Sequence, residues 1–237
     1  PTATSATRTI NWQVDDGQSA NHASNVGNST INITAVNDQP TIGANIASSA
    51  SVEDQGAPSG ASFGQTIASL SGINGQTLDV EGAAVGLAFV APIPATYGKA
   101  WYSIDGGTTW LDLTAKLATA SETNAFLLNA TARVYFQGNT NLNGTLGSAT
   151  VRTWDSTDGG TVGGYKDISA LEGPSGAYSA TTGALNFGVS AVNDTPVNTV
   201  PGAQTAAEDT DKVITGLSIT DVDAGTATNM SVTLTVT

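Results

Sequence analysis

Short acidic motifs occur twice along the chain, and side chains of their types are calcium ligands. Asn-Asp-x-Pro is found at residues 37–40 and again at 193–196, and further acids follow each copy. Ca²⁺ takes roughly six to eight oxygen ligands from carboxylates, Asn amides and backbone carbonyls. The sequence therefore predicts calcium at two hinges, with the candidate ligands Asn37, Asp38, Glu53, Asp54, Asp79 and Glu81 around the first and Asn193, Asp194, Glu208, Asp209, Asp221 and Asp223 around the second.

A simpler interpretation is that Asp and Asn stand at these positions because they favour turns. That preference explains any one motif, but it does not explain why three acidic motifs recur in the same order around each hinge. Acids that converge without Lys or Arg partners are costly unless a cation joins them. The recurrence therefore favours calcium over turn formation alone.

The acidic motifs belong to an internal repeat. Thr34–Pro40 recurs as Ser190–Pro196, about 156 residues later. The other matches keep the same order: residues 12–17 with 154–159, 52–54 with 207–209, and more loosely 78–82 with 220–224. This order predicts tandem domains.

The repeat also predicts the domain boundaries. Residues 1–40 are expected to form the last strands of one repeat, 41–196 a complete repeat, and 197–237 the first strands of the next. The proline of each hinge lacks an N–H donor, so a strand must end there. The two partial repeats would leave sheet edges open, and we expect them to be completed by further chain, by a neighbouring molecule, or by each other across molecules.

Composition favours an all-β protein. Thr and Val fit half-buried strands, and Gly, Asn and Ser supply turns. Strands are expected at 61–70, 85–89, 100–104, 109–113, 132–137, 149–153 and 185–191. No stretch is convincingly helical, and the only candidates for a helix are 111–120 and 124–133. The strand spacing indicates tandem β-sandwiches of the Ig-like or cadherin-like kind.

Charge excludes some partners. Twenty acidic residues face seven basic ones, for a formal net charge of −13. Such a chain lacks the Lys and Arg that neutralise nucleic-acid phosphates, and it repels anionic membranes. Cysteine is absent, and no apolar run approaches the roughly 20 residues of a membrane-spanning helix. We therefore predict neither nucleic-acid binding nor membrane insertion.

The motifs resemble tandem cadherin-like repeats of large bacterial surface adhesins. The resemblance is carried by Val-Asn-Asp-x-Pro at 36–40 and 192–196, by the Glu-Asp pairs, by Asp-Val-Asp-Ala-Gly at 221–225, and by the hairpin sequence Trp101–Trp110. It implies type I secretion, an extracellular rod stiffened by interdomain calcium, and a role in adhesion or biofilm at the cell surface. The central copy reads Asp-Val-Glu where the later copy reads Asp-Val-Asp, so its hinge is expected to bind calcium differently or weakly.

An enzyme is not expected. His22 is the single histidine, it lies in a polar stretch, and no nucleophile elbow accompanies it. Asp155 and Asp158 could serve a glycosidase, but their position among turn residues favours a surface or ligand role. Ser103–Trp110 fits the Asp-box pattern of sialidases, yet it occurs once, whereas a propeller would repeat it.

The expected function is a structural and adhesive extension module, with calcium and neighbouring repeats as partners. One alternative is a self-assembling extracellular filament or surface-layer subunit, in which the partial repeats of different molecules exchange strands head-to-tail. A second is carbohydrate binding to a glycan or cell-surface receptor, for which the candidate aromatic residues are Tyr97, Trp101, Tyr102, Trp110 and Tyr135.

Overall fold

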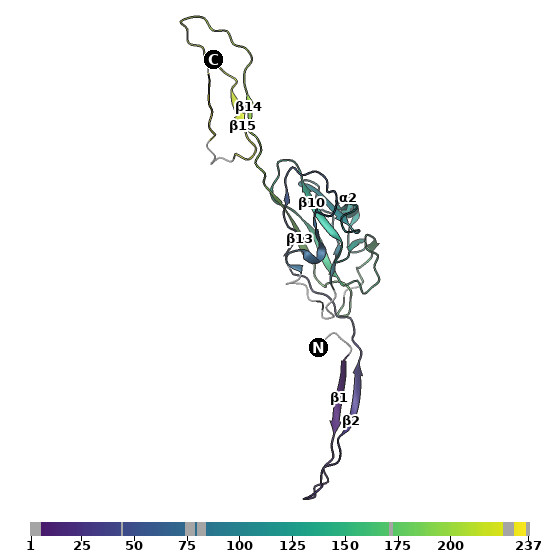
Figure 1. Ribbon diagram of the computed structural model, residues 1–237. Helices are drawn as coiled ribbons and strands as arrows, with labels where there is room; N and C mark the ends of the chain where they lie inside the picture. The colour runs from purple at the N-terminus through teal and green to yellow at the C-terminus, as the bar shows by residue number, and fades with distance from the viewer. Residues whose placement is uncertain are drawn as a thin grey trace.

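The computed structural model describes residues 6–43, 45–73, 79, 84–170, 173–224 and 230–235. A central body lies between a β-hairpin near the N-terminus and a small two-stranded sheet near the C-terminus (Figure 1). Two sheets form the central body, and helical structure within the described residues is limited to short segments. The expected all-β sandwich is confirmed.

The larger sheet has seven strands in the order β12-β9-β6-β11-β13-β3, with β4 also paired to β13. Neighbouring strands are antiparallel except that β3 and β4 run parallel to β13. Their bounds are β3 Asn45–Ala47, β4 Ser51–Val52, β6 Gly86–Phe89, β9 Ala125–Leu128, β11 Gly144–Trp154, β12 Tyr165–Lys166 and β13 Gly183–Ser190.

The smaller sheet has four strands in the order β5-β10-β7-β8. These are β5 Gln65–Thr66, β7 Gly98–Ser103, β8 Leu111–Asp112 and β10 Arg133–Gly138. Apolar side chains of both sheets share one core, in which the rings of Phe136 on β10 and Phe187 on β13 stack with centroids 5.0 Å apart. β6 and β9 are buried at every position, because a second cluster around Trp154 and Tyr178 covers the other face of the sheet.

Most of the expected strands are present. β6, β7, β10, β11 and β13 lie at or overlap the expected ranges, and β8 covers the middle of 109–113. The helical candidate 111–120 contains α2, Leu113–Lys116, followed by a 3₁₀ turn at Leu117–Thr119. Asp112 caps α2 by accepting a hydrogen bond from Ala115 N.

Two expectations fail for local reasons. The strand expected at 61–70 is reduced to β5, followed by a 3₁₀ turn at Ile67–Ser69. Gly64 has a φ of +59°, and a Cβ there would lie 2.3 Å from Val134 O, so the chain bends where β10 approaches closely. The helical candidate 124–133 instead forms β9 and the turn before β10.

The N-terminal hairpin has two different faces. It pairs β1, Ala6–Trp12, with β2, Gly27–Ile33. Their register places Ile10, Trp12, Ile31 and Ile33 on one face, and only Thr and Asn pairs on the other. The apolar face is exposed: Ile31 is 48% accessible, whereas its repeat counterpart Phe187 is 0% accessible. The hairpin therefore has the side-chain pattern of a sandwich strand pair whose inner face is uncovered among the described residues.

The C-terminal part pairs β14, Val197–Thr199, with β15, Ser218–Thr220. Its apolar side chains are also exposed within the described residues, including Val197, Val200, Val213, Ile214, Leu217 and Leu234. The predicted domain boundaries at 40/41 and 196/197 stay predictions.

Asp158 organises the second cluster. Its carboxylate accepts hydrogen bonds from Trp154 Nε1 at 2.8 Å and from Tyr178 OH at 2.6 Å, and it pairs with Lys166 Nζ at 2.7 Å. Burial alone would raise the pKa of this carboxyl, but these bonds and one from Gly160 N lower it to about 2. A carboxylate with a lowered pKa stabilises the fold only while it is ionised.

We expect Asp158→Asn to cost about 1–3 kcal/mol of unfolding free energy at pH 7, because it removes a charged acceptor from partly buried donors. In the wild type this contribution is complete above the unfolded-state pKa near 4 and is lost as the pH falls toward about 2. Denaturant unfolding of both proteins at several pH values checks this. Equal unfolding free energies at pH 7 would contradict it.

Candidate metal site

The parallel pairing of β4 with β13 brings two acidic motifs together. Both strands run toward the same end of the sandwich, so the Glu53-Asp54 turn that follows β4 lies beside the Asn193-Asp194 hinge that follows β13. Hydrogen bonds join the two segments, from Glu53 N to Ser190 O at 3.0 Å and from Val192 N to Glu53 Oε1 at 2.6 Å. The carboxylate of Glu53 is thereby fixed against the exit of β13.

The two acids of this turn are held in different ways. Glu53 is 2% accessible, and its other carboxylate oxygen accepts a hydrogen bond from Asn143 Nδ2 at 3.3 Å. Asp54 is exposed, has a φ of +61°, and accepts from Asn141 N at 3.2 Å. Asp and Asn tolerate this left-handed backbone better than most residues. The turn therefore presents one buried and one exposed carboxylate at the end of the domain.

Asp221 and Asp223 reach the same place from the next segment. Asp223 Oδ2 accepts a hydrogen bond from Asp194 N. Asp221 Oδ1 accepts from the backbone N–H groups of Asp223 at 3.0 Å and Ala224 at 3.1 Å, which closes a tight turn. Five acids, which we call the hinge cluster, thus come from three separate segments: Glu53, Asp54, Asp194, Asp221 and Asp223.

The other acids of the hinge cluster act on the ionisation of Asp194. Burial raises the pKa of Asp194, and the negative charges of Asp54, Asp223, Glu53 and Asp221 raise it further. Asp194 Oδ2 is sealed from solvent and has no hydrogen-bond partner in the described part of the chain. None of the ion pairs found among the described residues includes a member of the hinge cluster.

The cluster is not a finished coordination sphere. Within the described residues, no group of three or more His, Cys, Asp or Glu side chains is arranged so that it could hold a metal ion. The acids are near enough to perturb one another, but an ion would have to draw them closer. Asn193 is next to the cluster, and its amide donates to Asp194 O at 2.9 Å, which leaves its side-chain carbonyl oxygen as a possible ligand.

The first hinge is built differently. Asn37 Nδ2 donates to Asp155 Oδ2 at 2.9 Å. The side-chain amide of Gln39 donates to Tyr178 O, and its backbone N–H donates to Pro174 O. These bonds hold the segment that precedes the sandwich against one end of the sandwich. Asp155 is buried and also accepts from Thr157. Asp155 lies in the repeated segment 154–159, but it is not among the ligands predicted for the first hinge.

The structure assigns some of the remaining predicted ligands to a different hinge from the one that the sequence suggested. Asp38 is exposed, Asp79 is half-buried, and Glu81 lies outside the described residues. Glu53 and Asp54 were grouped with the first hinge, and the structure places them at the second, because their strand pairs in parallel with the last strand of the domain. Glu208 and Asp209 are exposed and are not among the charges that act on Asp194.

Asp209 nevertheless repeats the geometry of Asp54. Both residues have a φ of +61°, and both follow a Glu in a turn. The repeat relation therefore extends to the backbone conformation, and it predicts that Glu208-Asp209 would serve a hinge further along the chain.

Other residues with chemical potential have local roles. His22 lies in the hairpin loop, with Nδ1 2.8 Å from Asp15 Oδ2. In the Ser103–Trp110 hairpin, Asp105 accepts from Thr109 N and from Ser103 Oγ, and these bonds lower its pKa to about 2. The carboxylate thus shapes the turn between β7 and β8, as the hairpin interpretation of this sequence predicts.

Comparisons with known proteins add no identity. No protein-family model, curated protein or solved structure matches this chain. Among the described residues, no helix has the length and apolar character needed to cross a membrane.

The raised pKa of Asp194 predicts that removing its charge does not lower the thermal stability of the protein. Because the pKa of Asp194 is raised in the fold, folding favours its protonated form, and its contribution to stability falls as the pH rises through that pKa. We expect Asp194→Asn, in chelator at pH 7, to melt at the same temperature as the wild type or slightly higher. The difference should shrink as the pH is lowered toward 4. A clear loss of stability in chelator at pH 7 would show instead that the carboxylate is a favourable structural acceptor.

Proposed function

We propose that this chain is a structural extension module of an extracellular surface protein, in which calcium at the hinge cluster fixes one repeat against the next. The observation that carries the proposal is the meeting of five acids from three segments around a buried, unpartnered oxygen of Asp194. Calcium is the cation of choice because every candidate ligand is an oxygen. The resemblance to cadherin-like adhesin repeats supports the extracellular and adhesive part of the proposal.

The mechanism is linkage between ion binding and order. Glu53 and Asp54 belong to the central sandwich, whereas Asp221 and Asp223 belong to the segment beyond the hinge. An ion that binds both groups stabilises the arrangement in which they are close, by RT ln(1 + [Ca²⁺]/Kd). Extracellular modules bind calcium with Kd values of about 10⁻⁴–10⁻³ M, so such a hinge would become rigid outside the cell and stay flexible inside it.

We expect calcium to raise the melting temperature of the wild-type chain. At a free calcium concentration of about ten times Kd, the gain is about 1.4 kcal/mol, or roughly 3–6 °C for a domain of this size. Differential scanning calorimetry in calcium and in chelator measures it. Magnesium at the same concentration is the ion control, because it demands a smaller octahedral site and dehydrates reluctantly.

Two matched variants locate the effect. Asp54→Asn keeps the side-chain shape and the left-handed backbone but removes a ligand charge, and it should lose most of the calcium shift. Asp167→Asn removes the same charge from an exposed turn outside the cluster and should keep the shift. A calcium response that is absent in the wild type, or equal in both variants, would contradict calcium binding at this hinge.

The hairpin favours a second candidate function, head-to-tail assembly of copies. In the central sandwich, the edge of β13 is paired with β3 and β4, which come from the start of the same repeat. The part of the chain that begins at Val197 starts with a corresponding segment, marked by the Glu208-Asp209 turn, and most of its described apolar side chains are exposed. We infer that a segment of this kind pairs with the edge of β2 that β1 leaves open and extends the apolar face of the hairpin, and in solutions of this chain a second copy can supply it.

We expect the chain to form concentration-dependent oligomers, measured by size-exclusion chromatography with light scattering. Ile31→Lys places a charge on the apolar face and should give monomers. Thr30→Lys, one residue away on the polar face, should behave like the wild type. A wild-type chain that stays monomeric across the concentration range would rule out assembly by this route.

A further inference from the structure

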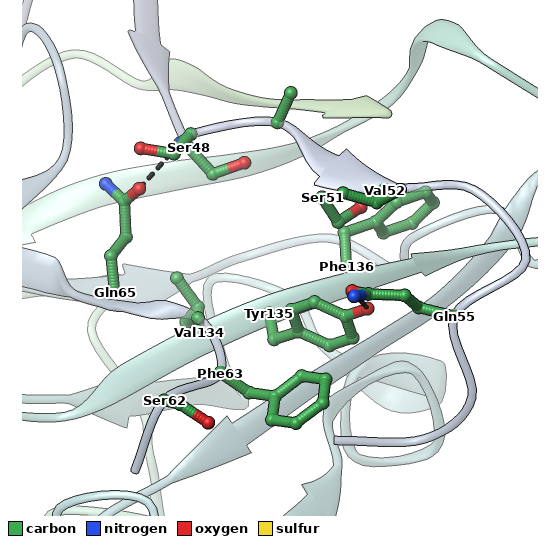
Figure 2. Close-up of a pocket in the computed structure, with 13 residues that line it drawn as sticks. Ser48, Ser51, Val52, Gln55, Ser62, Phe63, Gln65, Val134, Tyr135 and Phe136 are labelled. Atoms are coloured by element: carbon green, nitrogen blue, oxygen red, sulfur yellow. Dashed lines mark hydrogen bonds between the residues drawn. The ribbon is translucent and has the colours of Figure 1, made fainter. Parts of the chain in front are cut away.

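A groove opens along one side of the central sandwich, and one end of it adjoins the hinge cluster, because Val52 and Gln55 flank the Glu53-Asp54 turn. It lies between the segment Ser48–Val52 and the edge of β10, and its volume is about 420 Å³ (Figure 2). β5 pairs with β10 only opposite Arg133 and Val134, so among the described strands none pairs with this edge from Tyr135 onward. Pockets of roughly 300–1,000 Å³ are the usual size for small ligands.

The groove exists because the edge strand formed by β3 and β4 departs from regular pairing with β13 between its two paired segments. Ala47 pairs with Asn186 and Ser51 pairs with Val189, so the edge strand has one more residue than β13 over this stretch. The extra residue makes a bulge, and bulges redirect side chains at sheet edges. Ser48, Ser49 and Ala50 thereby line the groove.

The lining carries no formal charge, in a chain whose net charge is −13. Its polar side-chain groups are serine hydroxyls, the amides of Gln55 and Gln65, and the hydroxyl of Tyr135. An ionic ligand would find no counter-charge here, whereas a ligand that bears hydroxyl groups would find both donors and acceptors. The lining therefore selects for neutral, hydrogen-bonding ligands.

Two observations indicate that hydrogen-bonding capacity is left for such a ligand. Ser48 Oγ is closed to solvent and has no hydrogen-bond partner in the described part of the protein, so its side chain must rotate to meet a ligand in the groove. The side-chain oxygen Oε1 of Gln55 accepts a hydrogen bond from Tyr135 OH at 3.3 Å. The two N–H donors of the same side-chain amide are left to bind a ligand. Gln65 is already held, because its Oε1 accepts from Ser49 N at 2.6 Å.

Aromatic rings line the side of the groove opposite Ser48. Figure 2 shows Tyr135 beside Gln55 and Phe63 below it. The two rings meet edge to face with centroids 5.4 Å apart, and the Trp110 ring lies 6.3 Å from Tyr135, which is 6% accessible, so Phe63 presents most of the accessible ring surface. A wall of hydroxyl and amide groups facing aromatic rings suits a sugar, whose ring has polar edges and apolar C–H faces.

An added peptide strand fits less well. A strand placed between two others needs about 9.5 Å between its neighbours, since paired strands lie about 4.7–4.9 Å apart. The Cα atoms of β4 and β10 already approach within 8 Å of each other. The groove is therefore too narrow at β4 for an intercalated strand.

We propose that this groove binds a neutral saccharide unit, with Ser48 and Gln55 as hydrogen-bonding residues and Phe63 and Tyr135 as the apolar wall. Of the aromatic residues that the sequence suggested for sugar binding, Tyr135 alone lines this groove. Trp101 is engaged elsewhere: its Nε1 donates to Gln137, and Lys99 lies over its ring at 4.3 Å. The proposal is independent of calcium at the hinge cluster.

The test is an array of neutral and charged mono- and disaccharides, followed by calorimetric titration of the best neutral sugar with the full chain. Ser48→Val removes the hydroxyl and should weaken binding about three- to tenfold, the effect of one neutral hydrogen bond. Gln55→Ala should weaken it similarly. Ser48→Val should leave the melting temperature unchanged or raised, because it removes an unsatisfied buried hydroxyl.

The matched control is Tyr97→Ala, which removes an exposed aromatic ring outside the groove and should leave the affinity unchanged. A loss of binding in Tyr97→Ala but not in Ser48→Val would place the sugar elsewhere and overturn the proposal. A blank array, binding of charged glycans alone, or binding of an extended peptide in place of a sugar would overturn it as well.

Discussion

Parallel pairing between the first and last strands of the central sandwich is the constraint on which the other features depend. β3 and β4 run in the same direction as β13, so the chain that enters a domain ends its first strand where the last strand leaves. The Glu53-Asp54 turn and the Asn193-Asp194 hinge are far apart in sequence and adjacent in space for this reason. The same pairing needs a one-residue bulge, and the bulge opens the groove along β10. The candidate metal site and the candidate sugar site are thus two consequences of one edge strand.

The sequence predicted most of the longer strands of the sandwich, whether or not their side chains alternate between core and solvent. β13 does alternate, with every second residue buried, whereas β10 and β11 each contain a continuous run of buried residues. The segment 61–70 has a similar apolar content, but Gly64 and the turn at Ile67 bend it around β10, a contact between residues far apart in the chain. β9 is buried at every position, as β6 is, but its residues fell within the helical candidate 124–133, and burial alone does not distinguish a buried strand from a buried helix.

The candidate metal site was predictable in its residue types and less so in its grouping. Repetition identified the acids, and the nearest motif along the chain was taken as the spatial neighbour. That inference assumes that a hinge gathers the motifs closest to it in sequence. The hinge cluster instead combines acids from the turn after β4, from the segment after β13 and from the segment after β15, because a non-local parallel ladder decides which motifs meet. The groove had no sequence signal beyond the run of small polar residues at 48–51.

The edge strand also decides how the sandwich carries tension. The chain enters beside Pro40 and leaves after Ser190, and the strands at these two points lie side by side and parallel. When such a domain is pulled by its neighbours, β3 and β4 are drawn in one direction and β13 in the other along the strand axis. The hydrogen bonds of that ladder are then loaded together in shear, not opened one after another like a zipper. A chain of such repeats therefore meets a pulling force with the ladder in its strongest orientation.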